Sequence, residues 1–194
     1  MFTKPRALSS ALMVAATAML AACGDAPVEP TPSVQDADVP VAMSEMRAPD
    51  LGGACAIVRA PAGTTLHSYA YAKGVQIYRW DGAAWVFVAP EATLFATPLM
   101  IGRIGTHYAG PTWESLGGSK VMAAVKERCT PNANAIPWLL LGATSNVGRG
   151  LYAKTTFIQR LQTVGGLAPA APGAMVGEMK RVPYTALYLF YRAR

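Results

Sequence analysis

Histidine and cysteine are scarce in this chain of 194 residues, which holds two histidines and three cysteines. Transition-metal sites are usually built from several imidazoles or thiolates. No cysteine has a neighbouring ligand at zinc-like spacing, and spacing does not support a site of His67, His107 and a carboxylate, so we expect no metal and no cofactor. The chain also lacks a G-x-S-x-G elbow, a Walker phosphate loop and a strand followed by a G-x-G-x-x-G turn and a helix. These absences argue against serine hydrolases, P-loop enzymes and dinucleotide-dependent dehydrogenases.

Long apolar runs are also missing beyond the N-terminus. The best candidate, residues 136–143, falls far short of a membrane-spanning helix and suits a buried strand. The N-terminus itself is different, because Lys4 and Arg6 give a charged start, residues 7–20 are mostly apolar, and small residues lead to Cys23. This pattern is typical of a secretory signal peptide.

The sequence Leu20-Ala21-Ala22-Cys23 resembles the lipobox of bacterial lipoproteins. The resemblance implies a signal peptide over residues 1–22, cleavage before Cys23, and lipid chains such as palmitate on that cysteine, which would attach the protein firmly to a membrane. Because Gly24 follows the cysteine instead of an aspartate, the resemblance implies an exported protein at the outer membrane of the bacterial cell envelope. An ordinary cleaved signal with an incidental cysteine is the alternative.

The segment that follows, residues 23–50, has no aromatic residue, five prolines and six acidic residues. It cannot bury enough apolar surface to offset the entropy cost of ordering. We therefore predict a flexible, acidic tether, with the alternative that residues 39–46 pack on the domain as an irregular edge. Residues 51–194 have a globular composition and a length that fits one domain with a proper core.

Charge is distributed unevenly between these two segments. Residues 51–194 hold fourteen Lys and Arg against five Asp and Glu, a formal charge of +9. A domain this basic favours anionic surfaces such as lipid headgroups or anionic glycans, although scattered basic residues can also serve solubility alone. No polybasic block is present, so we expect no nucleic-acid partner. The basic residues that stand closest together are Lys126, Arg128, Lys180 and Arg181.

Two cysteines remain in the domain, Cys55 and Cys129. In an exported protein an even pair is most simply a disulfide, and two buried free thiols are the alternative. A bridge between them would close a loop of more than seventy residues. In the chain-entropy model such a loop contributes about 4 kcal/mol to stability.

Short apolar alternations separated by Gly and Pro turns predict an all-β domain, an antiparallel sandwich or barrel with long loops. Residues 155–162 favour a strand over a short helix because of their β-branched side chains. Strict alternation places Trp85, Phe87 and Ala89 on one face, and Lys73-Gly74 is expected to end a strand. The longest loop is expected at 165–180. The other expected strands are 66–72, 75–80, 85–89, 112–115, 119–125, 136–143 and 184–191.

Several segments together resemble one family, over roughly residues 63–194. They are Gly74-Val75-Gln76-Ile77-Tyr78, His107-Tyr108-Ala109-Gly110-Pro111-Thr112-Trp113-Glu114, Ile136-Pro137-Trp138-Leu139-Leu140-Leu141, Ile158-Gln159-Arg160, Thr163-Val164-Gly165-Gly166 and Val182-Pro183-Tyr184. Their order and spacing are similar to those of the secreted domain-of-unknown-function family DUF3455. The resemblance implies no activity, because the family has no established one.

The segment from His107 to Glu114 is the candidate catalytic site. Histidine transfers protons most easily near neutrality, Glu114 could orient it, and Asp81 could join them if the fold brings the hairpins together. The structural alternative is a packed corner in which His107 satisfies backbone groups and Glu114 pairs with an arginine. Beside the turn, Tyr108 and Trp113 are the aromatic residues best placed to stack on a ligand.

Taken together, these features favour a non-catalytic binding module for an anionic or glycan component of the cell surface. Lys126, Arg128, Lys180 and Arg181 are its candidate contacts, together with Tyr108 and Trp113. One alternative is a hydrolase-like enzyme centred on His107 and Glu114, which requires the two side chains to meet in one cleft. The other is a purely structural envelope protein.

Overall fold

A computed structural model describes residue 49 and residues 51–194. The signal peptide, the lipidation site Cys23 and the tether, residue 49 excepted, lie outside the described residues, so their predictions stay predictions. In the described part of the chain, no helix is long and apolar enough to cross a membrane.

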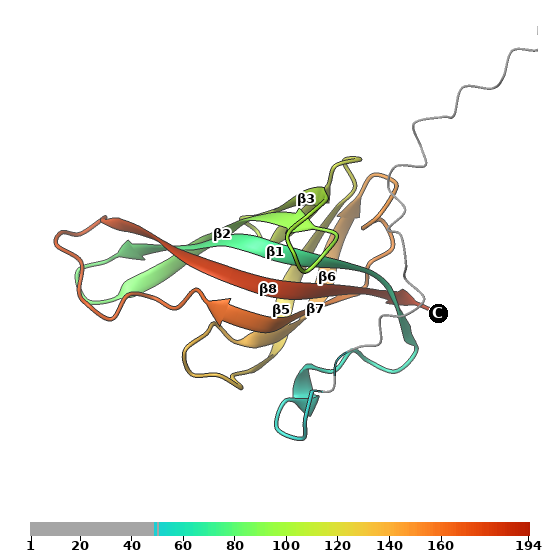
Figure 1. The fold of residues 1–194 in the computed structure, drawn as a ribbon, viewed down its shortest axis with the longest axis horizontal. Helices are drawn as coiled ribbons and strands as arrows, with labels where there is room; N and C mark the ends of the chain where they lie inside the picture. Colours follow the sequence, from blue (N-terminus) through green and yellow to red (C-terminus); the bar gives the residue numbers. More distant parts are fainter. Residues whose placement is uncertain (1–48, 50) are drawn as a thin grey trace, which may run out of the picture. The chain divides into compact units, whose positions relative to one another are not determined.

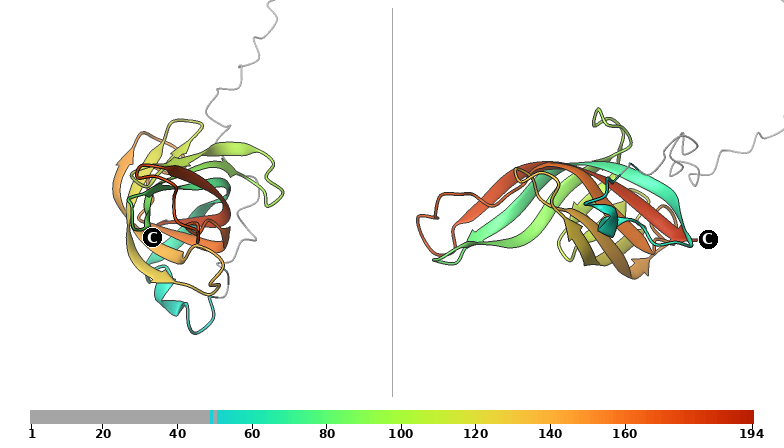
Figure 2. Two further views of the ribbon diagram at one scale, coloured as in Figure 1. Left: turned by 90° about the vertical axis from the view of Figure 1, so that its left-hand side faces the viewer. Right: turned by 90° about the horizontal axis from the view of Figure 1, so that it is seen from below.

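Eight antiparallel strands form a closed barrel in which each strand pairs with its neighbours in sequence and β8 pairs with β1 (Figures 1 and 2). The all-β prediction is confirmed, and of its two architectures the chain adopts the barrel. The 3-10 turn η2 (Ala56–Val58) precedes the strands. The strands are β1 (Thr64–Trp80), β2 (Trp85–Phe95), β3 (Arg103–Tyr108), β4 (Thr112–Ser115), β5 (Lys120–Cys129), β6 (Trp138–Val147), β7 (Phe157–Gly165) and β8 (Met179–Ala193).

The hairpins predicted from turn residues are present. β1 and β2 join through residues 81–84. There the Asp81 carboxylate accepts hydrogen bonds from the backbone N–H groups of Ala83 and Ala84, each 2.8 Å long. An aspartate that bonds its own turn in this way is a frequent turn device. β4 and β5 form the second predicted hairpin. The segment with β-branched residues is strand β7, as expected.

Two local predictions on the first hairpin are wrong. Gly74 does not end a strand, because β1 runs through it, and a Cβ at this position would lie 2.1 Å from the carbonyl oxygen of Glu91 on β2. The glycine therefore permits a close approach of two strands. Ala89 pairs with Ile77 whereas Phe87 pairs with Tyr78, so Val88 is an extra residue in the ladder. This bulge places Ala89 and Phe87 on opposite faces and interrupts the strict alternation.

The main core fills the inside of the barrel. Strand β8 contributes Tyr184, Ala186, Tyr188 and Phe190, which recur at every second residue, as expected for one face of a strand. Leu139 and Leu141 of β6 contribute in the same way.

A second core lies on the outer face of β6, β7 and β8, under the segment that contains η2. Its members include Val58, Leu140, Leu187 and Leu189. The disulfide between Cys55 and Cys129 joins this segment to the end of β5, with the two Cα atoms 5.4 Å apart. The predicted disulfide is confirmed. Because both faces of β6 are covered, its continuously apolar sequence is explained.

The connection between β6 and β7 closes one end of the barrel. Tyr152 in this connection is fully buried, and its ring centroid lies 4.5 Å from that of Phe190. Its backbone N–H donates to the Ser119 hydroxyl over 3.0 Å, and the Asn146 amide donates to its carbonyl oxygen over 2.8 Å. We call this the closed end of the barrel.

Candidate ligand cavity at the open end of the barrel

The opposite end of the barrel holds a cavity of about 360 Å³. Strands β1, β2 and β8 extend past the other strands at this end, since the last pair of β2 with β3 is Ala92 with His107 (Figure 1). The turn between β3 and β4 and the end of the loop between β5 and β6 also line the cavity, through Gly110, Pro111, Ile136 and Pro137. We call this the open end.

Three aromatic rings form the floor of the cavity. His107 of β3 stacks on Trp113 of β4, with centroids 4.2 Å apart and planes 13° apart. The ring of Tyr188 stands edge-on to both, at 5.2 Å from His107 and 5.3 Å from Trp113. The three residues meet because His107 and Trp113 are paired across the hairpin and Tyr188 faces the same interior from β8. Offset and edge-on rings of this kind pack favourably.

His107 is a neutral, structurally held ring. It is 2% exposed, and its Nδ1–H donates to the Thr112 carbonyl oxygen over 2.8 Å. Burial lowers the pKa of His107 to about 3, the hydrogen bond to Thr112 opposes this shift, and the positive charge of Arg160 adds to it. At neutral pH the ring therefore carries no charge, and its Nε2 holds a lone pair.

Arg160 of β7 is the cation inside this end of the barrel. It pairs with Leu139 and Tyr188 on the neighbouring strands, which places it in the same interior row as these two residues. Its Nε and Nη2 donate to the Pro137 carbonyl oxygen over 3.1 and 2.9 Å. Among the residues that the structure describes, no carboxylate lies within ion-pair distance of it. The guanidinium also lies beside the Tyr188 hydroxyl, and its five N–H groups outnumber these partners at the cavity wall.

The remaining polar groups near Arg160 are hydroxyls and one amide. Tyr184 and Tyr188 hydroxyl oxygens lie 3.4 Å apart. Burial raises the pKa of both, so they stay protonated and can donate. Gln76 lines the cavity, is 2% exposed, and its amide lies beside the Tyr184 hydroxyl. Trp113 also lines the cavity and is 1% exposed, and its Nε1–H has no hydrogen-bond partner in the described part of the chain. Buried N–H groups in folded proteins nearly always have a partner, so this one is an unused donor.

The rim of the cavity is apolar and partly open. Phe87 and Val88 of β2 and Val125 of β5 line it and are between 41% and 50% exposed. Arg128, also on β5, is the second cation in the lining. The bulge at Val88 is what allows Phe87 and Val88 to line the cavity together. Large apolar side chains exposed around a cavity mark a surface that another molecule can cover.

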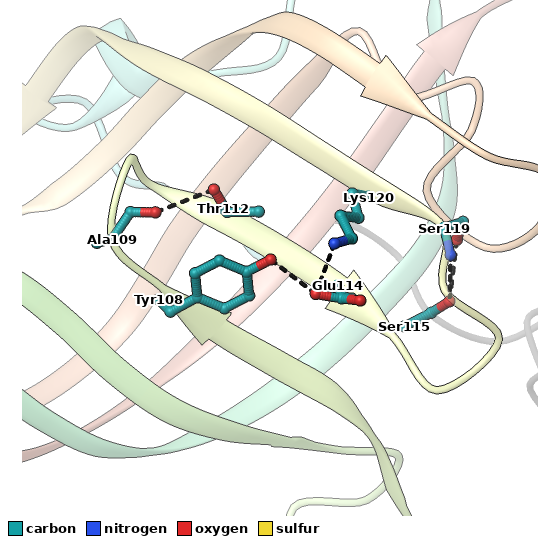
Figure 3. Close-up of polar contacts among 7 residues, drawn as sticks. All are labelled: Tyr108, Ala109, Thr112, Glu114, Ser115, Ser119 and Lys120. Carbon is teal, nitrogen blue, oxygen red and sulfur yellow. Dashed lines mark hydrogen bonds and ion pairs between the residues drawn. The ribbon is translucent and has the colours of Figure 1, made fainter.

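The structure does not bring the two main candidate catalytic residues together. His107 pairs with Trp113 and faces the interior, whereas Glu114 pairs with Thr106 and faces the outside. Neighbouring residues in a strand point to opposite faces. Around the Glu114 carboxylate, the Tyr108 hydroxyl donates over 2.7 Å and the Lys120 ammonium lies 3.3 Å away (Figure 3). Because the two side chains share no cleft, the hydrolase interpretation loses the geometry that it requires.

The other candidates are divided between the surface and the cavity. Tyr108 is engaged with Glu114 on the outer face, and Asp81 caps the tip of the first hairpin, so neither lines the cavity. Trp113 does line it. Of the four basic candidates, Arg128 lines the cavity and Lys126 does not. The other two are in ion pairs, Lys180 with Glu178 at 2.8 Å and Arg181 with Glu91 at 2.7 Å. Exposed pairs of this kind contribute little to stability but reduce the net charge that the surface presents.

No group of three His, Cys, Asp or Glu residues that could hold a metal ion occurs in the described part of the chain. His67 lies toward the closed end, where its Nε2 is 3.2 Å from the Thr155 hydroxyl. The described residues thus offer neither the ligands for a metal site nor a carboxylate beside His107.

Sequence reasoning missed Arg160, Gln76 and Tyr188 as residues of the cavity. The alternation in β7 contains the signal, since Ile158 and Arg160 share one face and Gln159 and Leu161 the other. From sequence the two faces look equally apolar, so the inner one could not be chosen. The structure shows which face is inside. The Gln159 amide donates to the Val58 carbonyl oxygen in the outer core at 2.6 Å, so Arg160, the next residue, faces the interior.

The fold and the site together define a class of protein. It is a closed antiparallel barrel with one plugged end and a ligand-sized cavity at the other. The chain belongs to the family described as protein of unknown function (DUF3455), whose family model matches residues 61–192. This match confirms the family resemblance seen in the sequence. Comparisons with curated proteins and with solved structures found no match.

Proposed function

We propose that the domain is a non-catalytic binding module that holds a small ligand in the cavity at the open end. The observation that carries the proposal is the cavity itself, about 360 Å³ of space inside a barrel whose other end Tyr152 closes. Eight-stranded barrels are either filled by side chains or hold one small ligand, and ligand cavities run from about 300 to 1,000 Å³. The lining fits this class, since apolar walls surround a few polar groups.

We further propose that this module works in the bacterial cell envelope, attached by lipid at Cys23. The support for this is the lipobox-like sequence and the acidic, proline-rich stretch that follows it. The ligand class expected from the sequence is an anionic or glycan component of the cell surface. The cavity provides a defined place for such a ligand, in addition to the basic residues on the outer surface.

The test is to block the cavity mouth and measure binding of a neutral, environment-sensitive fluorophore, N-phenyl-1-naphthylamine. Val125 lines the mouth and is 41% exposed, so Val125→Trp adds bulk there without overpacking the core. We expect this change to weaken binding of the fluorophore at least about tenfold, which corresponds to about 1.4 kcal/mol.

The matched control is Met122→Trp on the same strand. Met122 is 38% exposed, does not line the cavity, and lies on the other side of β5 from the buried Val121 and Ala123. This variant should bind the fluorophore as the native chain does. Equal binding by both variants, or no binding by the native chain, would contradict the proposed function.

A further inference from the structure

We infer that the cavity selects amphiphiles that carry a carboxylate head group on an apolar body of medium length, and that Arg160 binds this head group. This inference rests on the proposed function and names the ligand class of the same cavity. Four features of the lining carry it, namely its charge, its hydrogen-bonding groups, its walls and its size.

The charge of the lining has one sign. Arg160 and Arg128 both line the cavity, and no Asp or Glu is among the described lining residues. A cation that is half-buried in a barrel without a counter-ion carries a desolvation cost that an anionic ligand would offset. The guanidinium also matches a carboxylate in shape, because its planar N–H groups can donate two parallel hydrogen bonds.

The neutral polar groups in and behind the wall include several donors. The Trp113 Nε1–H has no partner in the described part of the chain, and the buried hydroxyls of Tyr184 and Tyr188 stay protonated, so they can donate as well as accept. A carboxylate accepts hydrogen bonds and donates none. A glycan presents many hydroxyl groups that must also donate, and the side chains of the lining offer few acceptors for them besides His107 Nε2, the Gln76 amide oxygen and the Tyr188 hydroxyl oxygen. Of the two ligand classes expected from the sequence, the anionic one therefore fits this cavity better.

The rest of the wall is apolar. Leu139, Leu141 and Ile136 lie along it, and the exposed rim residues Phe87 and Val88 stand at its mouth. Burying apolar surface yields roughly 25 cal/mol for each Å² removed from water. A ligand that places its charge at Arg160 and its body against this wall satisfies both parts of the cavity. The volume, about 360 Å³, lies at the lower end of the range for small-molecule sites and favours a body of medium length over a full-length lipid.

The experiment compares three compounds with one body and three heads, octanoate, octanol and octylamine. Each is titrated against the full chain loaded with the neutral fluorophore, and displacement gives its affinity. We expect octanoate to displace the fluorophore at a concentration at least about tenfold lower than octanol, because hydrogen bonds to a charged group are stronger than those to a neutral one. Octylamine should be the weakest of the three. Equal displacement by octanoate and octanol would overturn the inference.

Variants locate the head group. Arg160→Met should reduce the octanoate-to-octanol preference to about one, and Arg160→Lys, which keeps the charge but loses the planar fork, should give an intermediate preference. Lys73→Met is the matched control, because it removes an exposed cation on β1 that does not line the cavity, and should keep the native preference. An unchanged preference in Arg160→Met would also overturn the inference.

The two proposals fail differently in this experiment. If the native chain binds neither the fluorophore nor any of the three compounds, the proposed function itself fails. If the fluorophore binds and octanol displaces it as well as octanoate does, the cavity binds ligands but does not select anions. Because the head-group series uses the native chain, this second result does not depend on whether any variant folds.

Discussion

The two ends of the barrel differ in how their polar groups are used. At the closed end, the Ser115 and Ser119 hydroxyls lie 3.0 Å apart, Ser119 also accepts from the Tyr152 backbone, and Asn146 holds the connection between β6 and β7. At the open end, Arg160 has no carboxylate partner in the described part of the chain, and the Trp113 Nε1–H has no hydrogen-bond partner there. Natural structures pair nearly all buried polar groups. The open end thus places a cation without a carboxylate partner beside a cavity, which indicates a ligand site, whereas the closed end is filled by the fully buried Tyr152 ring, which indicates a role in stability.

The largest expected effect is at the closed end. Tyr152→Ala removes a fully buried ring that packs on Phe190, and large-to-small changes of this kind cost roughly 3–5 kcal/mol. Val125→Ala at the open end removes atoms from a side chain that is 41% exposed and should cost about 1 kcal/mol or less. Urea unfolding of both variants measures the two free energies. Equal losses at both ends would contradict the division of roles.

The disulfide has the next largest expected effect, on the outer cover of the barrel. The bridge between Cys55 and Cys129 spans a sequence separation of 74 residues. Replacing both cysteines with alanine should lower the free energy of unfolding by up to about 4 kcal/mol, because the unfolded chain gains the entropy that the bridge removes. Unfolding of the native chain with and without a reducing agent is the control. If removal of the bridge leaves the free energy of unfolding unchanged, the bridge itself adds nothing to the stability of the barrel.

The smallest of the three effects is a dependence on pH that both ends share. The pKa of His107 at the open end is lowered to about 3, mainly by burial, and that of His67 toward the closed end to about 4, by burial and the charge of Arg192. Between these pKa values and the unfolded value of about 6.5, the unfolded chain binds more protons than the folded one. The contribution to stability is therefore complete above about pH 6.5 and falls as the pH is lowered through this range.

His107 can account for a loss of about 2 kcal/mol between pH 7 and pH 5, and His67, which is partly exposed, for a smaller one. His107→Phe keeps an aromatic ring against Trp113, and unfolding of this variant should show a shallower loss over the same range. His67→Phe is the companion variant for the closed end. A native-like slope in both variants would show that other groups set the acid sensitivity.

Local turn chemistry was enough to predict much of the fold. Asp81-Gly82 marked the first hairpin and Gly117-Gly118 the second, because these residues favour turns whatever their surroundings. Gly74 and Val88 were misjudged for the opposite reason. The approach of β2 to Gly74 and the bulge at Val88 depend on the partner strand, and a single strand's sequence does not record its register.

The candidate site was predictable only in part. His107, Trp113 and Arg128 were selected from sequence and do line the cavity, whereas Glu114 and Asp81 do not. His107 and Glu114 are seven residues apart in sequence, and the turn between β3 and β4 decides that they face opposite ways. The alternation in β7 places Arg160 on the same face as Ile158, but the outer cover makes both faces of β7 apolar, and only the closed barrel shows which face is inside.

The most direct test of the ligand cavity is the response of the four tryptophan indole N–H signals in a ¹H–¹⁵N NMR spectrum during titration with octanoate. Trp113 lines the cavity, and Trp80, Trp85 and Trp138 do not, so the other three serve as internal references. We predict that the Trp113 signal shifts in a saturable way while the other three signals move little. If the Trp113 signal stays in place up to saturating octanoate, or if only signals from the other tryptophans shift, the open end of the barrel is not the binding site.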